Sequence, residues 1–198
     1  FYRSIYNIFK EDLEKKNLRC EYTSEIRDNY LYMDRTHVEE VAMNLISNAI
    51  KYTPEGGLIK VRVTQERGET PEDCYINTFI EDSGIGMSQE FLDHVFDAFS
   101  RERSEDTVNI TGTGLGLAIS KRLIDLMGGS IHIDSKLGRG TKISITIPHK
   151  IAKDKEDAVD KSTEPDMDEL KNIRILLAED NDFNAEIAIE LLEDSGLS

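Results

Sequence analysis

The sequence predicts an α/β fold, in which helices and strands follow one another along the first 150 residues, and three observations support this prediction. Residues 36–52 repeat apolar side chains at helical spacing. Residues 58–66 and 74–82 alternate apolar and polar side chains, as half-buried strands do. Residues 114–127 form a further helical segment, which ends at two glycines and precedes two more strand-like segments.

The N-terminal elements follow from the same spacing rules. Residues 1–17 predict an amphipathic helix, and short extended segments follow near 18–24 and 30–33. The apolar stripe of this first helix consists of Ile5, Ile8, Phe9 and Leu13. The next helix is predicted to begin at Thr36, with Glu39 completing a capping box three residues later.

The remaining elements are delimited by turn residues. The helix from Thr36 ends at the turn formed by residues 53–57, and its apolar stripe consists of Val38, Val41, Ala42, Leu45, Ile46 and Ala49. Residues 88–99 predict another helix, which would bury Phe91, Leu92, Val95, Phe96 and Phe99. Strands near 130–135 and 140–147 share a turn at residues 137–139.

Composition excludes several classes of function. The net charge of the chain is −15, and residues 153–198 alone carry 15 acidic against 5 basic side chains. Such a surface repels nucleic acid and anionic lipid, so we expect neither as a partner. No stretch approaches the ~18 apolar residues of a membrane span, and the start of the sequence lacks the pattern of a signal peptide. Cys20 and Cys74 form no CxxC pair, which fits a reducing compartment, and the four scattered histidines predict no zinc site.

The same composition divides the chain into three parts. Residues 1–150 form the predicted α/β domain, and residues 151–170 form an acidic linker with few large apolar side chains. Residues 171–198 contain an apolar strand followed by a helical segment, which is the beginning of a second α/β domain.

One face of the helix from Thr36 carries polar groups suited to a metal and phosphates. At about 100° per residue, Asn44, Asn48 and Lys51 fall on one narrow line with Glu40 and His37, away from the apolar stripe. An amide oxygen is a hard ligand for Mg²⁺, and an ammonium group is a movable positive charge for phosphate. A solvated helix face has the same composition, so both interpretations remain open at this point.

Three glycine-containing segments follow. Asp82-Ser83-Gly84-Ile85-Gly86 comes directly after a strand, where the Asp82 carboxylate would accept a hydrogen bond from the adenine amino group and would disfavour guanine, which has a carbonyl there. Gly112-Thr113-Gly114-Leu115-Gly116-Leu117 opens a helix with N–H groups suited to phosphate, without the spacing or βαβ context of a dinucleotide-binding fingerprint. Gly138-Arg139-Gly140-Thr141 is a hairpin turn, and its hydroxyl, on Thr141, would reach the base of the nucleotide or a water bound to that base.

Taken in order, these segments resemble the motifs of the catalytic, ATP-binding domain of bacterial sensor histidine kinases, within the gyrase-type (GHKL) ATPase superfamily. The matching segments are Asn44–Tyr52 (N box), Asp82–Gly86 (G1), Phe96–Phe99 (F box), Gly112–Leu117 (G2) and Gly140-Thr141 (G3). The resemblance covers about residues 1–150. It implies a two-layer α/β sandwich of the Bergerat type, with helices on one face of a mixed sheet and ATP bound between the layers.

The resemblance also implies roles for individual residues. Asn48 would ligate the Mg²⁺ that accompanies ATP, Lys51 would contact phosphate, and Tyr52 would lie near the adenine. Asp82 would bind the adenine amino group. The other implied nucleotide-binding residues are Gly84, Ile85, Gly86, Phe99, Gly112, Thr113, Gly114, Leu115, Gly116, Leu117 and Thr141.

Three residues are expected to be catalytic: Asn44, Lys51 and Arg101. Asn44, also expected to bind the nucleotide, stands where hydrolytic relatives have a glutamate that activates water. An amide cannot act as a base, so this position suits phosphoryl transfer better than hydrolysis. Arg101 would reach the γ-phosphate from a mobile ATP lid formed by residues 100–113.

The C-terminal segment resembles the start of a response-regulator receiver domain. Residues 175–181 read Ile-Leu-Leu-Ala-Glu-Asp-Asn, and an amphipathic helix follows them. By this resemblance, Glu179 and Asp180 would be the acidic pair that holds a receiver Mg²⁺. A kinase domain that leads into a receiver domain is the layout of hybrid histidine kinases. None of the four histidines lies in a phosphoacceptor motif, so we expect that histidine and the receiver's acceptor aspartate outside this sequence.

The expected function is transfer of the γ-phosphoryl of Mg·ATP to a histidine on the dimerisation domain of the same parent protein, for onward transfer to an aspartate of a receiver domain. The parent would be a homodimer. We expect this piece in the cytoplasm, and its parent either free or anchored in the inner membrane. Two alternatives remain: a serine kinase of the anti-sigma-factor type, against which the receiver-like tail argues, and a non-catalytic nucleotide-sensing module, against which the intact motifs argue.

Overall fold

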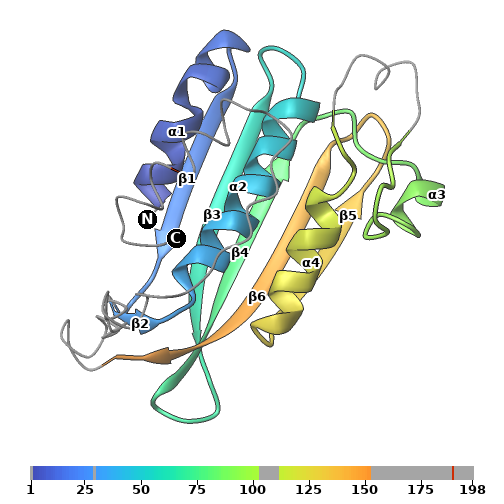
Figure 1. Cartoon of the computed structure of the whole chain (residues 1–198). Coiled ribbons are helices and arrows are strands. Elements are labelled where there is room, and N and C mark those ends of the chain that lie inside the picture. The colour runs from blue at the N-terminus through green and yellow to red at the C-terminus, as the bar shows by residue number, and fades with distance from the viewer. Residues whose placement is uncertain (1, 29, 103–111, 153–188, 190–198) are drawn as a thin grey trace. The chain divides into compact units, whose positions relative to one another are not determined.

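The computed structural model describes residues 2–28, 30–102, 112–152 and 189 (Figure 1). The chain divides into two units, Phe1–Ala158 and Val159–Ser198, and the fold below is that of the first. The helices are α1 (Tyr2–Lys15), α2 (Arg35–Tyr52), α3 (Gln89–Leu92) and α4 (Gly116–Leu126). The strands are β1 (Arg19–Glu25), β2 (Leu31–Tyr32), β3 (Leu58–Arg67), β4 (Asp73–Asp82), β5 (Ser130–Ser135) and β6 (Thr141–Ile151).

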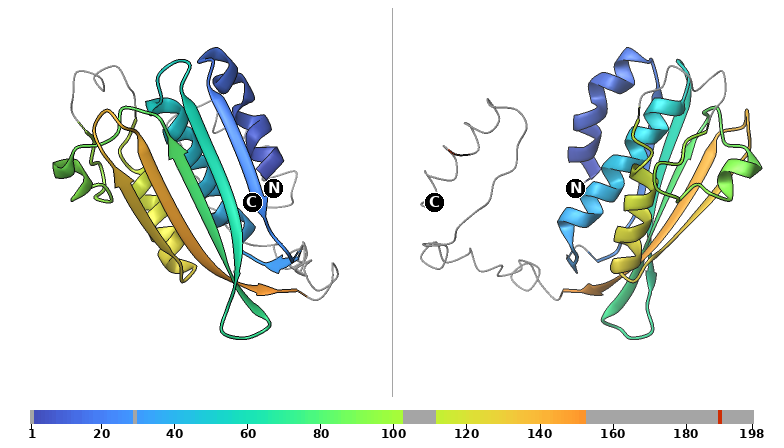
Figure 2. Two further views of the ribbon diagram at one scale, coloured as in Figure 1. Left: turned by 180° about the vertical axis from the view of Figure 1, so that it is seen from behind. Right: turned by 45° about the vertical axis from the view of Figure 1, so that its right-hand side comes forward.

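The strands form one mixed six-stranded sheet in the order β1-β3-β4-β6-β2, with β5 also paired to β6. β1 and β3 are parallel, and the other pairs are antiparallel. α1, α2 and α4 lie on one face of this sheet, and none of the helices that the structure describes covers the opposite face (Figure 2). The predicted fold class, an α/β sandwich with helices on one face of a mixed sheet, is therefore confirmed.

The hydrophobic core lies between the helices and the sheet. Alternate residues of the central strands are buried, as the sequence pattern predicts, and each such side chain stabilises the fold by about 1.5–3 kcal/mol. The buried core residues of β3, β6 and α2 are Ile59, Val61, Val63, Ile143, Ile145, Ile147, Val41, Leu45, Ala49 and Ile50. This packing fixes α2 over the sheet, and with it the direction of the polar face of that helix.

The helix-free face of the sheet carries a row of alternating charges across five strands. The register places Glu21 opposite Lys60, Lys60 opposite Glu81, Glu81 opposite Lys142, and Lys142 opposite Asp134. Two of these pairs form ion pairs, with 3.7 Å between Lys60 Nζ and Glu21 Oε2 and 3.2 Å between Lys142 Nζ and Glu81 Oε1. A one-residue slip of any strand would break this pattern, so the row favours the observed register.

The predicted capping box of α2 is wrong. The helix begins at Arg35, and its N-cap is Asp34, whose carboxylate accepts a hydrogen bond of 3.0 Å from the His37 N–H. Glu39, the predicted second member of the box, instead pairs with Arg35 at 2.8 Å. The ionised Asp34 acceptor lies two residues before Thr36, the predicted N-cap, and the helix starts at Arg35, one residue before the predicted position.

The predicted helix over residues 88–99 is also wrong in length. Ser88 Oγ accepts a hydrogen bond from the Phe91 N–H and begins α3, which ends at Leu92. The chain then continues in turns, and the Phe99 N–H donates to the Gly114 carbonyl at 3.0 Å, with Phe99 itself at a φ of 65°. From His94 to Asp97 the backbone hydrogen bonds span only three residues, as from the His94 N–H to the Phe91 carbonyl and from the Asp97 N–H to the His94 carbonyl, so the α-helix does not continue. Of the five apolar side chains predicted to be buried, only Val95 is, and Phe99 is 73% exposed.

The first helix forms as predicted, with one difference in its apolar stripe. Phe9 and Leu13 are buried in the core, whereas Ile8 is 58% exposed, and the side chain of Ile5 lies outside the described part of the structure. Among the residues that the structure describes, no helix is long and apolar enough for a membrane span.

Candidate functional site

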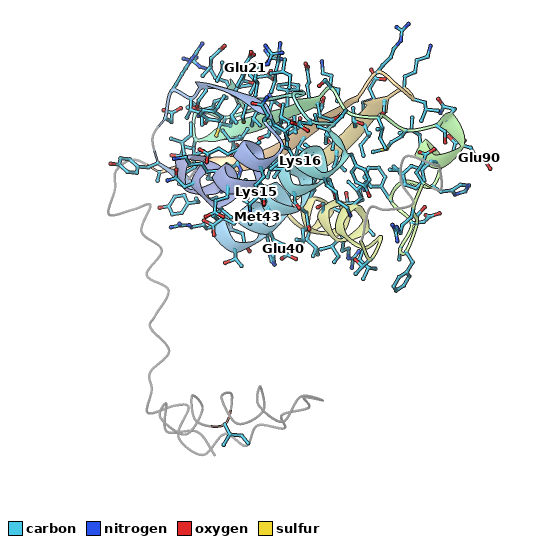
Figure 3. The ribbon with its side chains drawn as sticks, turned by 90° about the horizontal axis from the view of Figure 1, so that it is seen from above. Lys15, Lys16, Glu21, Glu40, Met43 and Glu90 are labelled. Carbon is cyan, nitrogen blue, oxygen red and sulfur yellow. The ribbon has the colours of Figure 1, made fainter. Side chains whose placement is uncertain are left out.

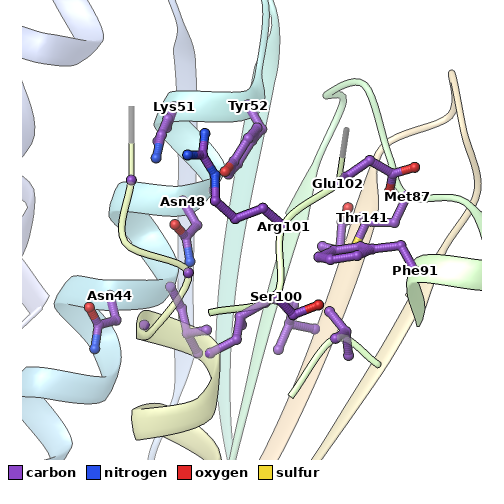
Figure 4. A pocket seen from close by; sticks show the side chains of 18 of the residues that line it. Asn44, Asn48, Lys51, Tyr52, Met87, Phe91, Ser100, Arg101, Glu102 and Thr141 are labelled. Carbon is purple, nitrogen blue, oxygen red and sulfur yellow. The ribbon is translucent and has the colours of Figure 1, made fainter. Parts of the chain in front are cut away.

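A pocket of about 230 Å³ lies between α2, the N-terminus of α4 and the adjoining ends of β4 and β6 (Figure 4). Its lining comes from segments that are distant in the sequence. The lining residues are Asn44, Leu45, Asn48, Ala49, Lys51, Tyr52, Asp82, Ile85, Gly86, Met87, Phe91, Val95, Ser100, Arg101, Glu102, Gly112, Thr113, Gly114, Gly116, Leu117, Thr141 and Ile143.

The polar line of α2 forms one wall of this pocket. Asn44, Asn48 and Lys51 follow one another along the helix and face the pocket, with Tyr52 at the end of the line (Figure 4). Lys51 Nζ lies 5.1 Å from the centre of the Tyr52 ring. Burial of the Lys51 ammonium group lowers its pKa, and the nearby Arg101 guanidinium lowers it further.

Arg101 enters the pocket beside Lys51 and Tyr52 from the segment after α3 (Figure 4). Burial raises the pKa of the Tyr52 phenol, and the Arg101 charge opposes that rise. Two cations held close together in a partly buried pocket repel each other, and an anionic ligand between them would relieve this repulsion.

A carboxylate stands at the sheet side of the pocket. Asp82 is the last residue of β4, and its Oδ1 accepts a hydrogen bond of 2.8 Å from the Gly84 N–H. Burial raises the pKa of the Asp82 carboxyl, while the Gly84 and Thr141 N–H groups lower it. The pocket therefore has a carboxylate on its sheet side and amides and a cation along α2.

The loop after Asp82 is held between α2 and the hairpin of β5 and β6. The Ile85 N–H donates to the Tyr52 carbonyl at 3.2 Å, and the Ile85 carbonyl accepts from the Gly138 N–H at 2.6 Å. A Cβ on Gly84 would stand 2.6 Å from both the Tyr52 carbonyl oxygen and Asp82 Oδ1, so only glycine allows this close approach.

Two glycines leave space beside the polar wall of α2. A Cβ on Gly116 would lie 3.4 Å from Asn44 Oδ1 and 3.9 Å from Asn48 Nδ2, and a Cβ on Gly112 would lie 2.5 Å from Lys51 Nζ. Side chains at these positions would fill the region where the Asn44 and Asn48 amide groups, the Lys51 ammonium group and the N-terminus of α4 converge. The resulting cradle fits a Mg²⁺ ion with phosphate oxygens, because hard oxygen ligands and cationic groups are both present.

The hairpin between β5 and β6 completes the sheet side. Ser135 Oγ accepts a hydrogen bond from the Met87 N–H at 2.9 Å, donates to the Gly140 carbonyl, and lies 2.9 Å from Thr141 Oγ1. Thr141 lies opposite Asp82 in the sheet register. The Thr141 hydroxyl and the Asp82 carboxylate are therefore neighbours at one end of the pocket.

The structure brings most of the predicted site residues together. Those that line the pocket are Asn44, Asn48, Lys51, Tyr52, Asp82, Ile85, Gly86, Arg101, Gly112, Thr113, Gly114, Gly116, Leu117 and Thr141. Gly84, Leu115 and Phe99 do not line it. Gly84 is packed between Asp82 and Tyr52, Leu115 occupies the N-cap of α4, and the positive φ of Phe99 accompanies an exposed side chain.

Several lining residues were not predicted. Ile143 follows Thr141 by two residues on the same face of β6, and Leu45 and Ala49 neighbour the asparagines on α2, so strand and helix periodicity could have identified them. No sequence pattern could have identified Glu102. Its Oε2 accepts a hydrogen bond of 3.1 Å from the N–H of Ser88, which is distant in the sequence, and local periodicity does not indicate such a contact. The others are Met87, Phe91, Val95 and Ser100.

Some predictions lie outside the described residues. The central part of the predicted lid, residues 103–111, is among them, and so are Glu179 and Asp180. In the part of the chain that the structure does describe, no group of three or more His, Cys, Asp or Glu side chains could hold a metal ion.

The comparisons with known proteins agree with this geometry. Residues 33–151 match the family model described as "Histidine kinase-, DNA gyrase B-, and HSP90-like ATPase". The chain is 41% identical over 124 residues to the sensor histidine kinase WalK of Bacillus subtilis (strain 168), covering 63% of this chain and 20% of WalK. It is 33% identical over 201 residues to the aerobic respiration control sensor protein ArcB of Escherichia coli (strain K12), covering 100% of this chain and 25% of ArcB.

A solved structure gives the same result. The nucleotide-free catalytic domain of histidine kinase ThkA is 28% identical and superposes with a TM-score of 0.57, covering 74% of this chain and 90% of that chain. The chain thus spans a quarter or less of the curated relatives above, but three quarters of it corresponds to nearly all of an isolated catalytic domain.

Proposed function

Because the chain belongs to the family of histidine kinase-, DNA gyrase B- and HSP90-like ATPases, we propose that it is the ATP-binding catalytic domain of a hybrid sensor histidine kinase. It is homologous to the catalytic domains of sensor histidine kinases. The proposed reaction transfers the γ-phosphoryl of Mg·ATP to a histidine on the dimerisation domain of the same homodimeric parent.

One observation carries this proposal: a single pocket combines a half-buried carboxylate with two amides and two cations. Asp82 and Thr141 supply an acceptor and a hydroxyl at the sheet side, as adenine recognition requires. Asn44, Asn48 and Lys51 supply hard oxygens and a positive charge along α2, as a metal triphosphate requires.

The metal would be held mainly on the α2 side of the pocket. Asn48 would contribute its amide oxygen to Mg²⁺ from the wall of the pocket that α2 forms. When bound, Mg²⁺ supplies charge neutralisation to the phosphates. Lys51 and Arg101 would orient the terminal phosphate, and the N-terminal N–H groups of α4 would bind the remaining phosphate oxygens.

Transfer in preference to hydrolysis follows from the residue at position 44. Asn44 faces the pocket and cannot take a proton from water. In the proposed step the bond between the γ-phosphorus and the bridging oxygen breaks, and a bond to the imidazole nitrogen of the acceptor histidine forms. ADP leaves with the electron pair of the broken bond, and the phosphorylated imidazole gives up its remaining ring N–H proton to solvent water.

The domain organisation is part of the proposal. We propose residues 1–150 as the catalytic domain, 151–170 as an acidic linker, and 171–198 as the beginning of a receiver domain with Glu179 and Asp180 as its acidic pair. The similarity to ArcB extends over the whole chain, which supports a continuous relationship beyond residue 151. The partners would be the histidine-bearing dimerisation domain and the receiver domain of the parent, and the parent would act in the cytoplasm or at the inner membrane.

A labelling experiment tests the substrate assignment. The chain incubated with γ-labelled ATP should bind the nucleotide yet carry no phosphohistidine, because none of its histidines lines the pocket. The four are His37, His94, His132 and His149. Stoichiometric acid-labile, base-stable label on any of them would contradict the assignment of the substrate to another domain.

Replacement of Asn48 by alanine should weaken ATP binding about tenfold in Mg²⁺ and much less in EDTA, because the amide oxygen acts through the metal. Isothermal calorimetry in both buffers measures the difference. Ser47→Ala, an exposed neighbour on α2, is the matched control and should change neither value. An equal loss in both buffers would mean that Asn48 supports the helix and not the metal.

ATP affinity should fall at high pH as Lys51 loses its proton. The pKa of its ammonium group is lowered from 10.5 in the nucleotide-free protein, and bound phosphate favours the protonated form. Affinity is therefore highest below the lowered pKa, falls as the pH rises through it, and binding in that range takes up a proton. Lys51→Arg keeps its charge and should show a flatter profile over the same pH range. Superimposable profiles for both proteins would exclude this role for Lys51.

A further inference from the structure

The last turn of α2 leaves four carbonyl groups without partners inside the helix, and the structure supplies one for each. The Ala49 carbonyl accepts from Thr53, through both its N–H and its hydroxyl. The Tyr52 carbonyl accepts from the Ile85 N–H. The remaining two carbonyls, of Ile50 and Lys51, accept from the Lys16 ammonium group, at 2.7 and 3.1 Å. One side chain from outside α2 therefore binds two of the four terminal carbonyls of this helix.

The way α1 ends brings Lys16 to this position. Asn17 has a φ of 49°, the Asn17 N–H donates to the Glu14 carbonyl, and the Leu18 N–H donates to the Leu13 carbonyl. This is the hydrogen-bond pattern of a Schellman motif, with Lys16 as the last residue before the left-handed turn. The Lys16 carbonyl accepts from the Gly56 N–H at 3.0 Å, so the turn is joined to the segment after α2 as well.

The contact is well suited to hold a helix end. A cation at the C-terminus of a helix also opposes the partial negative charge of the helix dipole. Burial lowers the pKa of the Lys16 ammonium group, which fits its place against α2, and Figure 3 shows Lys16 between α1 and α2. The preceding Lys15 is 69% exposed and pairs with Glu11 and Asp12 of its own helix.

We propose that Lys16 is a positioning residue of the nucleotide site: it holds the last turn of α2 so that the Lys51 ammonium group faces the phosphates. This inference rests on the proposed function. The two carbonyls that Lys16 binds belong to Lys51 itself and to the residue before it, whereas the carbonyls on either side keep their own donors. Loss of Lys16 therefore acts first on the backbone of Lys51.

The inference extends the site beyond the segment that matches the family. The family match begins at residue 33, whereas Lys16 and α1 precede it. A displacement of α1 would break both Lys16 hydrogen bonds and loosen the backbone of Lys51, whereas the Tyr52 carbonyl would keep the Ile85 N–H as its donor. The Lys16 ammonium group thus links the nucleotide site to the N-terminal helix.

Lys16→Met in the 198-residue chain should weaken Mg·ATP binding about tenfold, because two partly buried carbonyls lose their donor. Adenosine, which lacks the phosphates, should bind within about twofold of the wild-type affinity. Lys16→Arg, which keeps a charged donor, should restore most of the loss, and the matched control Lys15→Met should bind ATP normally. Calorimetry measures the affinities of the wild type and the three variants. It is done at a temperature at which circular dichroism shows that every variant is folded.

A double-mutant cycle separates positioning from general destabilisation. If Lys16 acts through Lys51, Lys16→Met should cost little further ATP affinity in a Lys51→Met background. Additive losses, an equal loss for adenosine, or unchanged ATP binding by folded Lys16→Met would each overturn the inference. Should Lys16→Met not fold, Lys16→Gln, which keeps an N–H donor, takes its place in the cycle. A wild-type chain that binds no ATP would instead refute the proposed function, and the inference with it.

Discussion

Asp82→Asn is expected to weaken ATP binding by about 5- to 150-fold, or ~1–3 kcal/mol, with a much smaller effect on GTP. The Asp82 carboxylate is half-buried at the end of β4 and is oriented by the Gly84 N–H, so it offers acceptors in a fixed direction. Asparagine has the same shape, but one of its two polar ends is a donor. That end would oppose the amino group of adenine.

Glu81→Gln is the matched control for this substitution. Glu81 is the preceding residue of β4, lies on the helix-free face of the sheet, and pairs with Lys142. Its replacement removes the same charge without touching the pocket, and ATP affinity should stay within about twofold of wild type. Calorimetric titrations with ATP and GTP measure both variants. Equal ATP and GTP affinity in the wild type, or an Asp82 variant that binds ATP normally, would overturn the adenine assignment.

Gly140→Ala is expected to destabilise the domain by about 2–5 kcal/mol and to weaken ATP binding as well. Gly140 has a φ of 85°, and a Cβ there would collide with the carbonyl oxygen of Asp82 and lie 3.1 Å from Ser83 Cα. The strain therefore falls on the end of β4 that carries the binding carboxylate. Urea unfolding gives the stability, and calorimetry gives the affinity.

Gly138→Ala separates backbone strain from this collision. Gly138 has a φ of 73° in the same hairpin, but a Cβ there would meet nothing within 4 Å. It should cost only the ~1–2 kcal/mol of an alanine in the left-handed region and leave ATP binding unchanged. Equal effects of the two substitutions would mean that the contact between the hairpin and Asp82 does not shape the site.

The sequence contains enough information for most of the fold because the core is periodic. Ile59, Val61 and Val63 alternate in β3, and Leu45 and Ala49 recur one turn apart in α2, so the period of each segment identifies it. The polar face of α2 was predictable for the same reason. Once Leu45 and Ala49 face the sheet, Asn44, Asn48 and Lys51 can only face elsewhere.

Contacts between distant segments were not predictable in this way. The 88–99 segment has helical apolar spacing, yet the helix ends at Leu92 and the chain continues in turns until the Phe99 N–H bonds to the Gly114 carbonyl. No local pattern indicates that partner, which lies 15 residues further along the chain. From the sequence alone, Lys16 is expected to be another exposed lysine of an amphipathic helix. Its role depends on the turn at Asn17 and on the end of α2, 34 residues further along the chain.

The most direct measurement supplies the chain with a separate polypeptide that carries the histidine-bearing dimerisation hairpin of the parent protein. With γ-labelled ATP and Mg²⁺, acid-labile, base-stable label should appear on the histidine of the hairpin, and Asn48→Ala or Asp82→Asn should greatly reduce its rate. Release of inorganic phosphate by the chain alone should be slow, because Asn44 cannot activate water. A chain that binds ATP but never labels the hairpin, or that hydrolyses ATP rapidly without it, would contradict the assignment as a histidine kinase domain.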